Sequence, residues 1–172
     1  IKDNPAEIEE RFYQDLKFGT SGIRGILGAG TNRMNIYVIT QASEAFARYL
    51  DTLGDEAKQR GIAISYDSRN GSVEFADRAA EIFATHGFKV YLSDELRPTP
   101  MLSFMVRELN CIGGVMVTAS HNPAPYNGYK AYGEDGGQLP PEAAAVVMAE
   151  MENIQDLTEI TWMSKAEAIE QG

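Results

Sequence analysis

The residues best suited to chemistry lie in one short segment, residues 118–123, with the sequence Thr-Ala-Ser-His-Asn-Pro. An uncharged run rich in β-branched residues, 112–117, leads into it, and turn-forming residues follow it. A serine hydroxyl on such a rigid loop can act as a nucleophile or carry a phosphoryl group, and Lys130 can supply positive charge or transfer a proton. Ordinary turns use the same residue types, because their side chains satisfy nearby backbone groups. Spacing alone favours that plain interpretation of Ser120 and His121.

A serine-hydrolase site is not predicted. The chain has no G-x-S-x-G elbow, and His121 would need unusual geometry to act as the base of its sequence neighbour Ser120. The other histidine, His86, directly precedes Gly87. We expect it to end a helix and to interact with the last carbonyl groups of that helix.

A second candidate segment, residues 18–25, has the sequence Phe-Gly-Thr-Ser-Gly-Ile-Arg-Gly. It is not a Walker loop, since no Gly-Lys-Ser/Thr follows, and no strand leads into it as a dinucleotide-binding motif requires. The composition predicts a bendable loop whose backbone N–H groups and Arg24 could bind a phosphate. Taken alone, the composition of residues 18–25 is explained better by a glycine-rich connecting loop in which Arg24 is exposed to solvent.

Asp67 and Arg69 are interpreted as a structural ion pair that fixes the end of a strand.

The elements that position these segments alternate between strand and helix. Short apolar runs predict strands at residues 62–66, 88–92 and 112–117. Apolar spacing and capping residues predict helices at about residues 5–16, 39–53, 75–86, 99–109 and 142–151, with one more starting at 164–167. This order implies parallel pairing of the three strands through right-handed crossovers. Residues 129–132 and 138–139 flank a predicted β-turn or hairpin, which would add a reversed strand.

The predicted fold class is therefore α/β: a three-layer α/β/α sandwich with a mixed, mostly parallel sheet, in one domain spanning residues 1–172. Ligands of open parallel sheets bind beyond the carboxyl ends of the strands. Three loops, at residues 67–69, 96–100 and 118–123, are expected to meet at that edge.

Composition limits the class of protein. The chain has 172 residues, 44% of them hydrophobic and 23% charged, as in a folded globular domain. No apolar stretch is long enough to cross a bilayer. The net charge of −10 argues against nucleic acid and anionic membranes as partners. The lone cysteine, Cys111, cannot form an intrachain disulfide, which favours a reducing, cytoplasmic setting.

Together these segments resemble the first domain of the α-D-phosphohexomutase superfamily, the phosphoglucomutases and phosphomannomutases. Residues 18–25 are similar to the N-terminal motif of that family, residues 118–123 to its phosphoserine signature, and residues 127–130 (Asn-Gly-Tyr-Lys) to the segment that follows. Residues 132–138 resemble the longer glucomutase-like branch, which also contains phosphopentomutases. Ser21 argues against phosphoglucosamine mutases, which usually carry Asp at that position.

The resemblance implies a role for each site residue. Ser120 would carry a phosphoryl group and pass it to a sugar monophosphate, so that phosphate moves between O1 and O6 through a bisphosphate intermediate. Lys130 would be the catalytic acid or base, and Arg24 and His121 would contact the phosphoryl group or the substrate. The residues expected to bind substrate are Thr20, Ser21, Arg24, His121 and Lys130.

The resemblance also implies partners that this chain does not contain. Mg²⁺ would be held by the phosphoryl oxygen on Ser120 and by an Asp-x-Asp-x-Asp-Arg loop of a second domain, with a sugar 1,6-bisphosphate as activator. That loop, and the sugar-binding and phosphate-binding loops of the third and fourth domains, have no counterpart here. We therefore expect a truncated product or an excised piece that folds but shows negligible mutase turnover. Two alternatives are a phosphopentomutase of the same superfamily and a non-catalytic module that binds phosphosugars or a partner.

Overall fold

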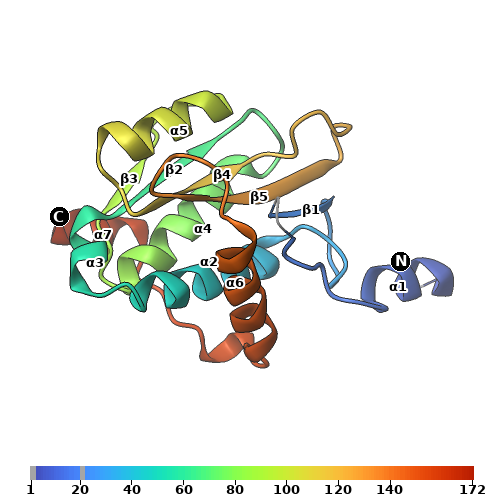
Figure 1. Cartoon of the computed structure of the whole chain (residues 1–172). Coiled ribbons are helices and arrows are strands. Elements are labelled where there is room, and N and C mark those ends of the chain that lie inside the picture. The colour runs from blue at the N-terminus through green and yellow to red at the C-terminus, as the bar shows by residue number, and fades with distance from the viewer. Residues whose placement is uncertain (1–2, 20–21) are drawn as a thin grey trace.

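A five-stranded sheet with strand order β1-β5-β4-β2-β3 forms the centre of the molecule (Figure 1). The computed structural model describes residues 3–19 and 22–172. The strands are β1 (Ile23–Ile26), β2 (Ile62–Tyr66), β3 (Val90–Leu92), β4 (Gly113–Val117) and β5 (Tyr126–Gly133). β2 pairs in parallel with β3 and β4, whereas β5 is antiparallel to β4 and β1. Four of the five strands therefore run in one direction, and the predicted mixed α/β sheet is confirmed.

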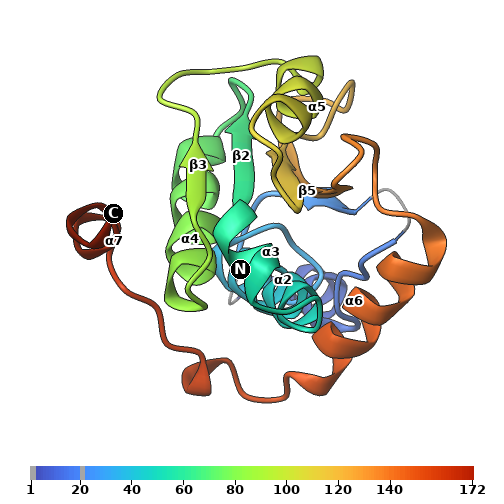
Figure 2. The same cartoon turned by 60° about the vertical axis from the view of Figure 1, so that its left-hand side comes forward.

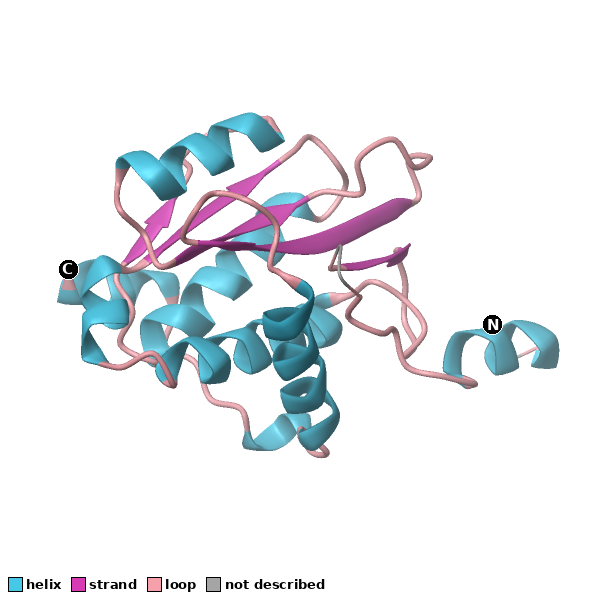
Figure 3. Cartoon of the chain, viewed as in Figure 1, coloured by secondary structure: helices cyan, strands magenta, loops and turns pink. Residues whose placement is uncertain are grey.

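Helices cover both faces of the sheet (Figure 3). The helices are α1 (Pro5–Phe12), α2 (Ile36–Asp51), α3 (Asp55–Arg60), α4 (Ser72–Thr85), α5 (Thr99–Glu108), α6 (Pro141–Asn153) and α7 (Lys165–Gln171). α5 packs on one face, and α2, α4 and α6 form the layer on the other. After α6 the chain passes across this helical layer to the outer side of α4, where α7 lies (Figure 2).

The core is divided by the sheet into two clusters. The larger lies between the sheet and the α2, α4 and α6 layer and contains Phe46, Phe83 and Tyr129. The smaller lies under α5 and contains Leu102 and Tyr132. Every residue of β2 and β4 is buried, as expected for strands covered on both faces. The two strands that carry the candidate loops are thus fixed at the centre of the sheet.

The N-terminal region corrects one prediction. Residues 18–25 were expected to form a loop throughout, but residues 23–26 are strand β1, with Ile23 opposite Tyr129 of β5. The strand has only four residues and includes Gly25, so local pattern does not distinguish it from a loop. Its pairing partner lies about a hundred residues away in the chain, and that pairing is what makes it a strand. α3 was not predicted either, because six residues are too few to show helical periodicity.

His86 follows α4 and connects it to α2. Its Nδ1 atom lies 2.7 Å from Asp51 Oδ2, and its Nε2 atom lies 2.9 Å from Glu44 Oε2. His86 ends α4 as predicted, and its backbone N–H donates to the Ile82 carbonyl oxygen at 3.2 Å. The prediction is wrong for the imidazole ring, because two carboxylates of a neighbouring helix take both ring nitrogens. These carboxylates, Glu44 foremost, raise the pKa of His86 although burial opposes them. The same carboxylates also form ion pairs, Glu44 with Arg48 and Asp51 with Lys58.

The raised pKa of His86 predicts a pH-dependent stability. The folded protein binds this proton more tightly than the unfolded chain, so the stabilisation is complete below about pH 6.5 and is lost as pH rises through the higher folded-state pKa. We expect the free energy of unfolding to fall over that interval, and His86→Gln to remove this component of the slope. Urea denaturation of both proteins from about pH 6 to about pH 9 measures it. Equal slopes in the two proteins would contradict the assignment.

Within residues 3–19 and 22–172, no helix has both the length and the apolar character needed to cross a bilayer.

Candidate active site

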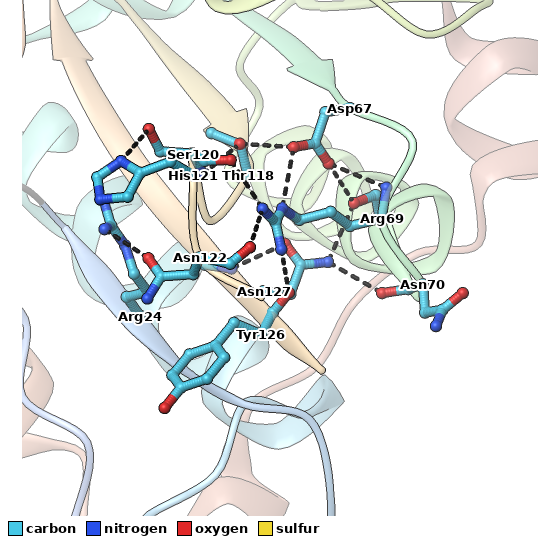
Figure 4. A network of polar contacts seen from close by, with 12 residues as sticks. Arg24, Asp67, Arg69, Asn70, Thr118, Ser120, His121, Asn122, Tyr126 and Asn127 are labelled. Carbon is cyan, nitrogen blue, oxygen red and sulfur yellow. Dashed lines mark hydrogen bonds and ion pairs between the residues drawn. The ribbon is translucent and has the colours of Figure 1, made fainter. Parts of the chain in front are cut away.

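The loops expected at the carboxyl edge of the sheet contact one another there. The Thr118 hydroxyl, just after β4, donates a hydrogen bond of 2.6 Å to Asp67 Oδ2, just after β2 (Figure 4). The Arg97 backbone N–H, in the loop after β3, donates to the carbonyl oxygen of Tyr66 at 2.9 Å. The parallel strands β2, β3 and β4 thus deliver their following loops to one place.

Ser120 lies at this edge with a strained backbone. Its φ is 57°, in the left-handed region that serine rarely occupies. The Ser120 N–H donates to Thr118 Oγ1 at 2.9 Å, and the residue is exposed. Its Oγ atom is 3.4 Å from His121 Nδ1, a long contact that holds the hydroxyl weakly. The hydroxyl is therefore accessible on a backbone that is fixed.

Arg24 and Lys130 lie on the same face of the sheet, on neighbouring strands. Arg24 of β1 is opposite Gly128 of β5, and Lys130 is two residues further along β5, where alternate residues share a face. Arg24 Nη1 donates to Asn122 Oδ1 at 2.7 Å, which brings the arginine to the Ser120 loop (Figure 4). Lys130 is half-buried, and this burial together with the charge of Arg24 lowers the pKa of Lys130. A lysine in this state releases its proton more readily than an exposed one.

Thr20 and Ser21, the other predicted substrate-binding residues, lie outside the described residues. The glycines on either side of them are joined by reciprocal backbone hydrogen bonds of 2.9 Å between Gly19 and Gly22. Gly22 has a φ of 86°, and a Cβ atom there would lie 2.0 Å from the carbonyl oxygen of Tyr129. Only glycine fits this close approach, which ties the glycine-rich segment to β5 beside Lys130.

The Asp67–Arg69 ion pair is present, with a distance of 3.3 Å between Arg69 Nε and Asp67 Oδ2. Arg69 has a second set of contacts that the sequence did not predict: its guanidinium group donates to backbone carbonyl groups of the loop that carries Ser120. Backbone carbonyls have no residue-type signature, so a sequence pattern predicts the ion pair but not these bonds.

The Asn-Gly-Tyr-Lys segment, residues 127–130 of β5, connects the site to neighbouring strands and loops. The buried Asn127 amide donates to the Asn70 carbonyl oxygen and to Ser72 Oγ, both at 3.0 Å, and so joins β5 to the loop after β2. At Gly128, a Cβ atom would lie 2.6 Å from the carbonyl oxygen of Ile23 and 2.7 Å from that of Thr118. The absence of a side chain there lets β1 and β4 approach β5 closely at the level of the Ser120 loop.

Comparison with known proteins assigns this arrangement to a family. The family model described as "Phosphoglucomutase/phosphomannomutase, alpha/beta/alpha domain I" matches residues 15–158. The chain belongs to the phosphoglucomutase/phosphomannomutase family. The match includes all four sequence segments that carry the resemblance and every strand of the sheet.

Relatives in this family are much longer than the chain. It is 42% identical over 160 residues to a phosphoglucomutase of Staphylococcus aureus (strain USA300), and the match covers 92% of this chain and 28% of that protein. It is 48% identical over 139 residues to a phosphoglucomutase of Staphylococcus epidermidis, covering 81% of this chain and 25% of the relative. The chain thus spans little more than a quarter of the relatives it matches. The names of these relatives denote isomerases.

Solved structures agree with the family assignment. The chain superposes on a crystal structure described as a phosphomannomutase of Thermus thermophilus with a TM-score of 0.74 and 32% identity, covering 88% of this chain and 33% of that one. It superposes on a phosphoglucomutase/phosphomannomutase family protein of Burkholderia thailandensis with a TM-score of 0.66, covering 83% of this chain and 31% of the other, where 20% identity supports the fold alone.

The donor atoms near Ser120 limit what metal this family domain could hold. Asp67 is the carboxylate bound to the Ser120 loop in the described part of the chain, and both of its oxygens already accept bonds from Thr118, Ser72 and Arg69. Across residues 3–19 and 22–172, no three His, Cys, Asp or Glu side chains are grouped to hold a metal ion. The side chains of the described residues therefore do not form a complete Mg²⁺ site by themselves.

The close strand approach at Gly128 predicts a large effect of a single methyl group. Gly128→Ala should lower the free energy of unfolding by about 1–3 kcal/mol, because the methyl group would overlap two backbone oxygens that cannot move independently. Gly133→Ala, at the other end of β5, is the matched control, since its Cβ atom would meet only the Asp135 side chain at 3.4 Å. Denaturation of both variants measures the difference, and equal stabilities would contradict the strand packing described here.

Proposed function

We propose that this chain is the phosphoserine-bearing domain of a phosphosugar mutase that moves phosphate between O1 and O6 of a hexose phosphate. The observation that carries the proposal is the exposed Ser120 hydroxyl on a fixed, left-handed loop, with Arg24 and Lys130 on the adjoining sheet face. The names of the relatives, phosphoglucomutase and phosphomannomutase, support it. Because the chain covers under a third of the phosphoglucomutase relatives, the activity is proposed for a longer protein that contains it.

Two phosphoryl transfers account for the reaction. In the first, the bond between phosphorus and Ser120 Oγ breaks as a hydroxyl oxygen of the sugar monophosphate bonds to phosphorus. The hydroxyl proton passes to the Lys130 amine, which relays it to the departing Ser120 Oγ, so that Ser120 becomes a hydroxyl and Lys130 is neutral again. In the second, the Ser120 hydroxyl oxygen bonds to the phosphorus at the other end of the bisphosphate as the bond from that phosphorus to the sugar oxygen breaks, and Lys130 relays the proton from Ser120 Oγ to the sugar oxygen. The lowered pKa of Lys130 makes its neutral, proton-accepting form more accessible.

The remaining site residues neutralise and orient the phosphoryl group. Arg24 is held by Asn122 beside the loop, where its guanidinium can pair with phosphate oxygens. His121, exposed next to Ser120, would contact the phosphoryl group or the sugar. Thr20 and Ser21 are assigned to substrate binding on the family resemblance alone. Positioning and charge neutralisation are the main requirements of phosphoryl transfer, and these residues can supply both.

The proposal extends to cofactor, activator and setting. Mg²⁺ would neutralise charge on the phosphoryl group of Ser120, with its carboxylate ligands in another domain of the longer protein, and a sugar 1,6-bisphosphate would supply the first phosphoryl group. The 172-residue chain alone would then fold but show negligible turnover and weak Mg²⁺ affinity. The free, buried thiol of Cys111 supports a cytoplasmic setting.

Phosphorylation of Ser120 tests the proposal directly. After incubation with glucose 1,6-bisphosphate and Mg²⁺, we expect one added phosphoryl group, mapped by mass spectrometry to Ser120 and missing in Ser120→Ala. Lys130→Met should slow its formation by roughly a hundredfold, as expected for loss of an acid–base group. The matched control is Lys89→Met, since Lys89 lies at the opposite end of the parallel strands and should leave the rate unchanged.

The negative outcomes distinguish the alternatives. No phosphate on Ser120, either in this chain or in a longer protein from the same reading frame, would favour the non-catalytic phosphosugar-binding module. Phosphate on Ser120 with turnover of pentose but not hexose phosphates by the longer protein would favour the phosphopentomutase. Interconversion of glucose 1-phosphate and glucose 6-phosphate by the 172 residues alone at ordinary enzyme rates would contradict the role proposed for the other domains.

A further inference from the structure

Arg69 is placed to control the shape of the Ser120 loop. Its side chain is only 13% exposed and lies between Asp67 and the loop (Figure 4). The two terminal nitrogens of the guanidinium group carry four N–H bonds, and the loop offers one carbonyl oxygen to each. Nη2 donates to Ser120 at 2.7 Å and to Asn122 at 2.8 Å, and Nη1 donates to Pro123 at 3.1 Å and to Tyr126 at 2.9 Å. One side chain therefore binds carbonyl oxygens along the loop between β4 and β5, from Ser120 to Tyr126 at the start of β5.

We propose that Arg69 is the positioning residue of the phosphoserine loop, holding Ser120 in the left-handed conformation that presents its hydroxyl. The inference rests on the proposed function and names how that site is kept in shape. Arg69 differs from Arg24 in that its N–H groups are all committed to Asp67 and the loop, so it has none left for a phosphoryl oxygen. Its role is therefore positional and not catalytic.

The Ser120 backbone is held on both sides. Its carbonyl oxygen accepts from Arg69, and its N–H donates to Thr118 Oγ1. The Thr118 hydroxyl in turn donates to Asp67, the carboxylate that pairs with Arg69. Asp67, Arg69 and Thr118 thus close a ring of bonds around the two peptide groups that define φ and ψ of Ser120. A left-handed serine persists only where its surroundings hold it there, and this ring is what holds it.

The demand on this ring is greatest during catalysis. A phosphoryl group brings a charge of about −1.5 to −2 to Ser120, and the group must stay aligned as it leaves and returns. The same guanidinium also holds Asn122 and Pro123 of the loop and Tyr126, the first residue of β5. Asn122 also binds Arg24, so Arg69 positions the phosphate-binding arginine as well as the serine.

Hydrogen exchange of the 172-residue chain, read by mass spectrometry, tests the role of Arg69. In Arg69→Met, we expect amides of residues 118–126 to exchange about tenfold faster or more, since four charge-assisted hydrogen bonds are lost. Amides of α2 and β2 should keep their wild-type rates. Arg69→Lys, which keeps the charge but cannot reach four carbonyls, should loosen the loop to a lesser degree and serves if the methionine variant does not fold.

Arg97→Met is the matched control. Arg97 lies at the same edge of the sheet, but its side chain pairs with the exposed Asp94 and Glu95 and with its own loop. Its loss should leave exchange of residues 118–126 unchanged. Unchanged loop exchange in both Arg69 variants, or an increase spread equally over the whole chain, would overturn the proposal, because Arg69 would then have no specific hold on the loop.

A second measurement separates this inference from the proposed function. The rate at which Ser120 takes a phosphoryl group from glucose 1,6-bisphosphate should fall in Arg69→Met and recover partly in Arg69→Lys, in the order of their loop exchange. A phosphorylation rate independent of loop exchange would overturn the positional role. If wild-type Ser120 accepts phosphate neither in this chain nor in the longer protein from the same reading frame, a loosened loop in Arg69→Met would still support the hold of Arg69 on the loop, and only the proposed function would be contradicted.

Discussion

The left-handed backbone of Ser120 is the constraint on which the site depends. A serine at φ 57° is unfavourable by itself, so its neighbours must supply the energy that keeps it there. The parallel strands β2 and β4 end side by side, and this places Asp67, Arg69 and Thr118 around the serine. The sheet thus serves as a rigid frame that fixes the Ser120 backbone and so the direction in which its side chain projects. In the phosphoglucomutase/phosphomannomutase family to which the chain belongs, such orientation is what phosphoryl transfer would require.

The reversed strand β5 completes the site from the other side. It starts at the end of the Ser120 loop and brings Lys130 to the face shared with Arg24. Gly22 and Gly128 let the neighbouring backbones come close enough for this, because a side chain at either position would overlap carbonyl oxygens. Arg24, Lys130 and Ser120 therefore come from three different stretches of the chain, and the pairing of β1, β4 and β5 brings these stretches together.

Local sequence signals predicted those parts of the fold that depend on neighbouring residues. Apolar runs identified β2 and β4, and the loops after them were expected where they lie. β1 was missed because its strand character comes from pairing with β5, and the contacts of His86 were missed because its carboxylate partners lie on α2. The contacts of Arg69 were predicted only in part. The ion pair with Asp67 could be predicted from two residues close in sequence, but the backbone carbonyl oxygens that Arg69 binds are the same in every residue type and leave no sequence signal. The roles proposed for Ser120, Arg24 and Lys130 rest on the family resemblance, because spacing alone allowed this chemistry but favoured an ordinary turn.

Comparing Ser120→Gly with Ser120→Ala tests the central claim most directly. Both substitutions remove the hydroxyl, but only glycine adopts the left-handed conformation without strain. If the surrounding bonds impose that conformation, the glycine variant will be more stable than the alanine variant by about 1 kcal/mol in chemical denaturation. An alanine variant as stable as the glycine variant, or more so, would show that the loop does not hold residue 120 in this conformation, and would contradict the account.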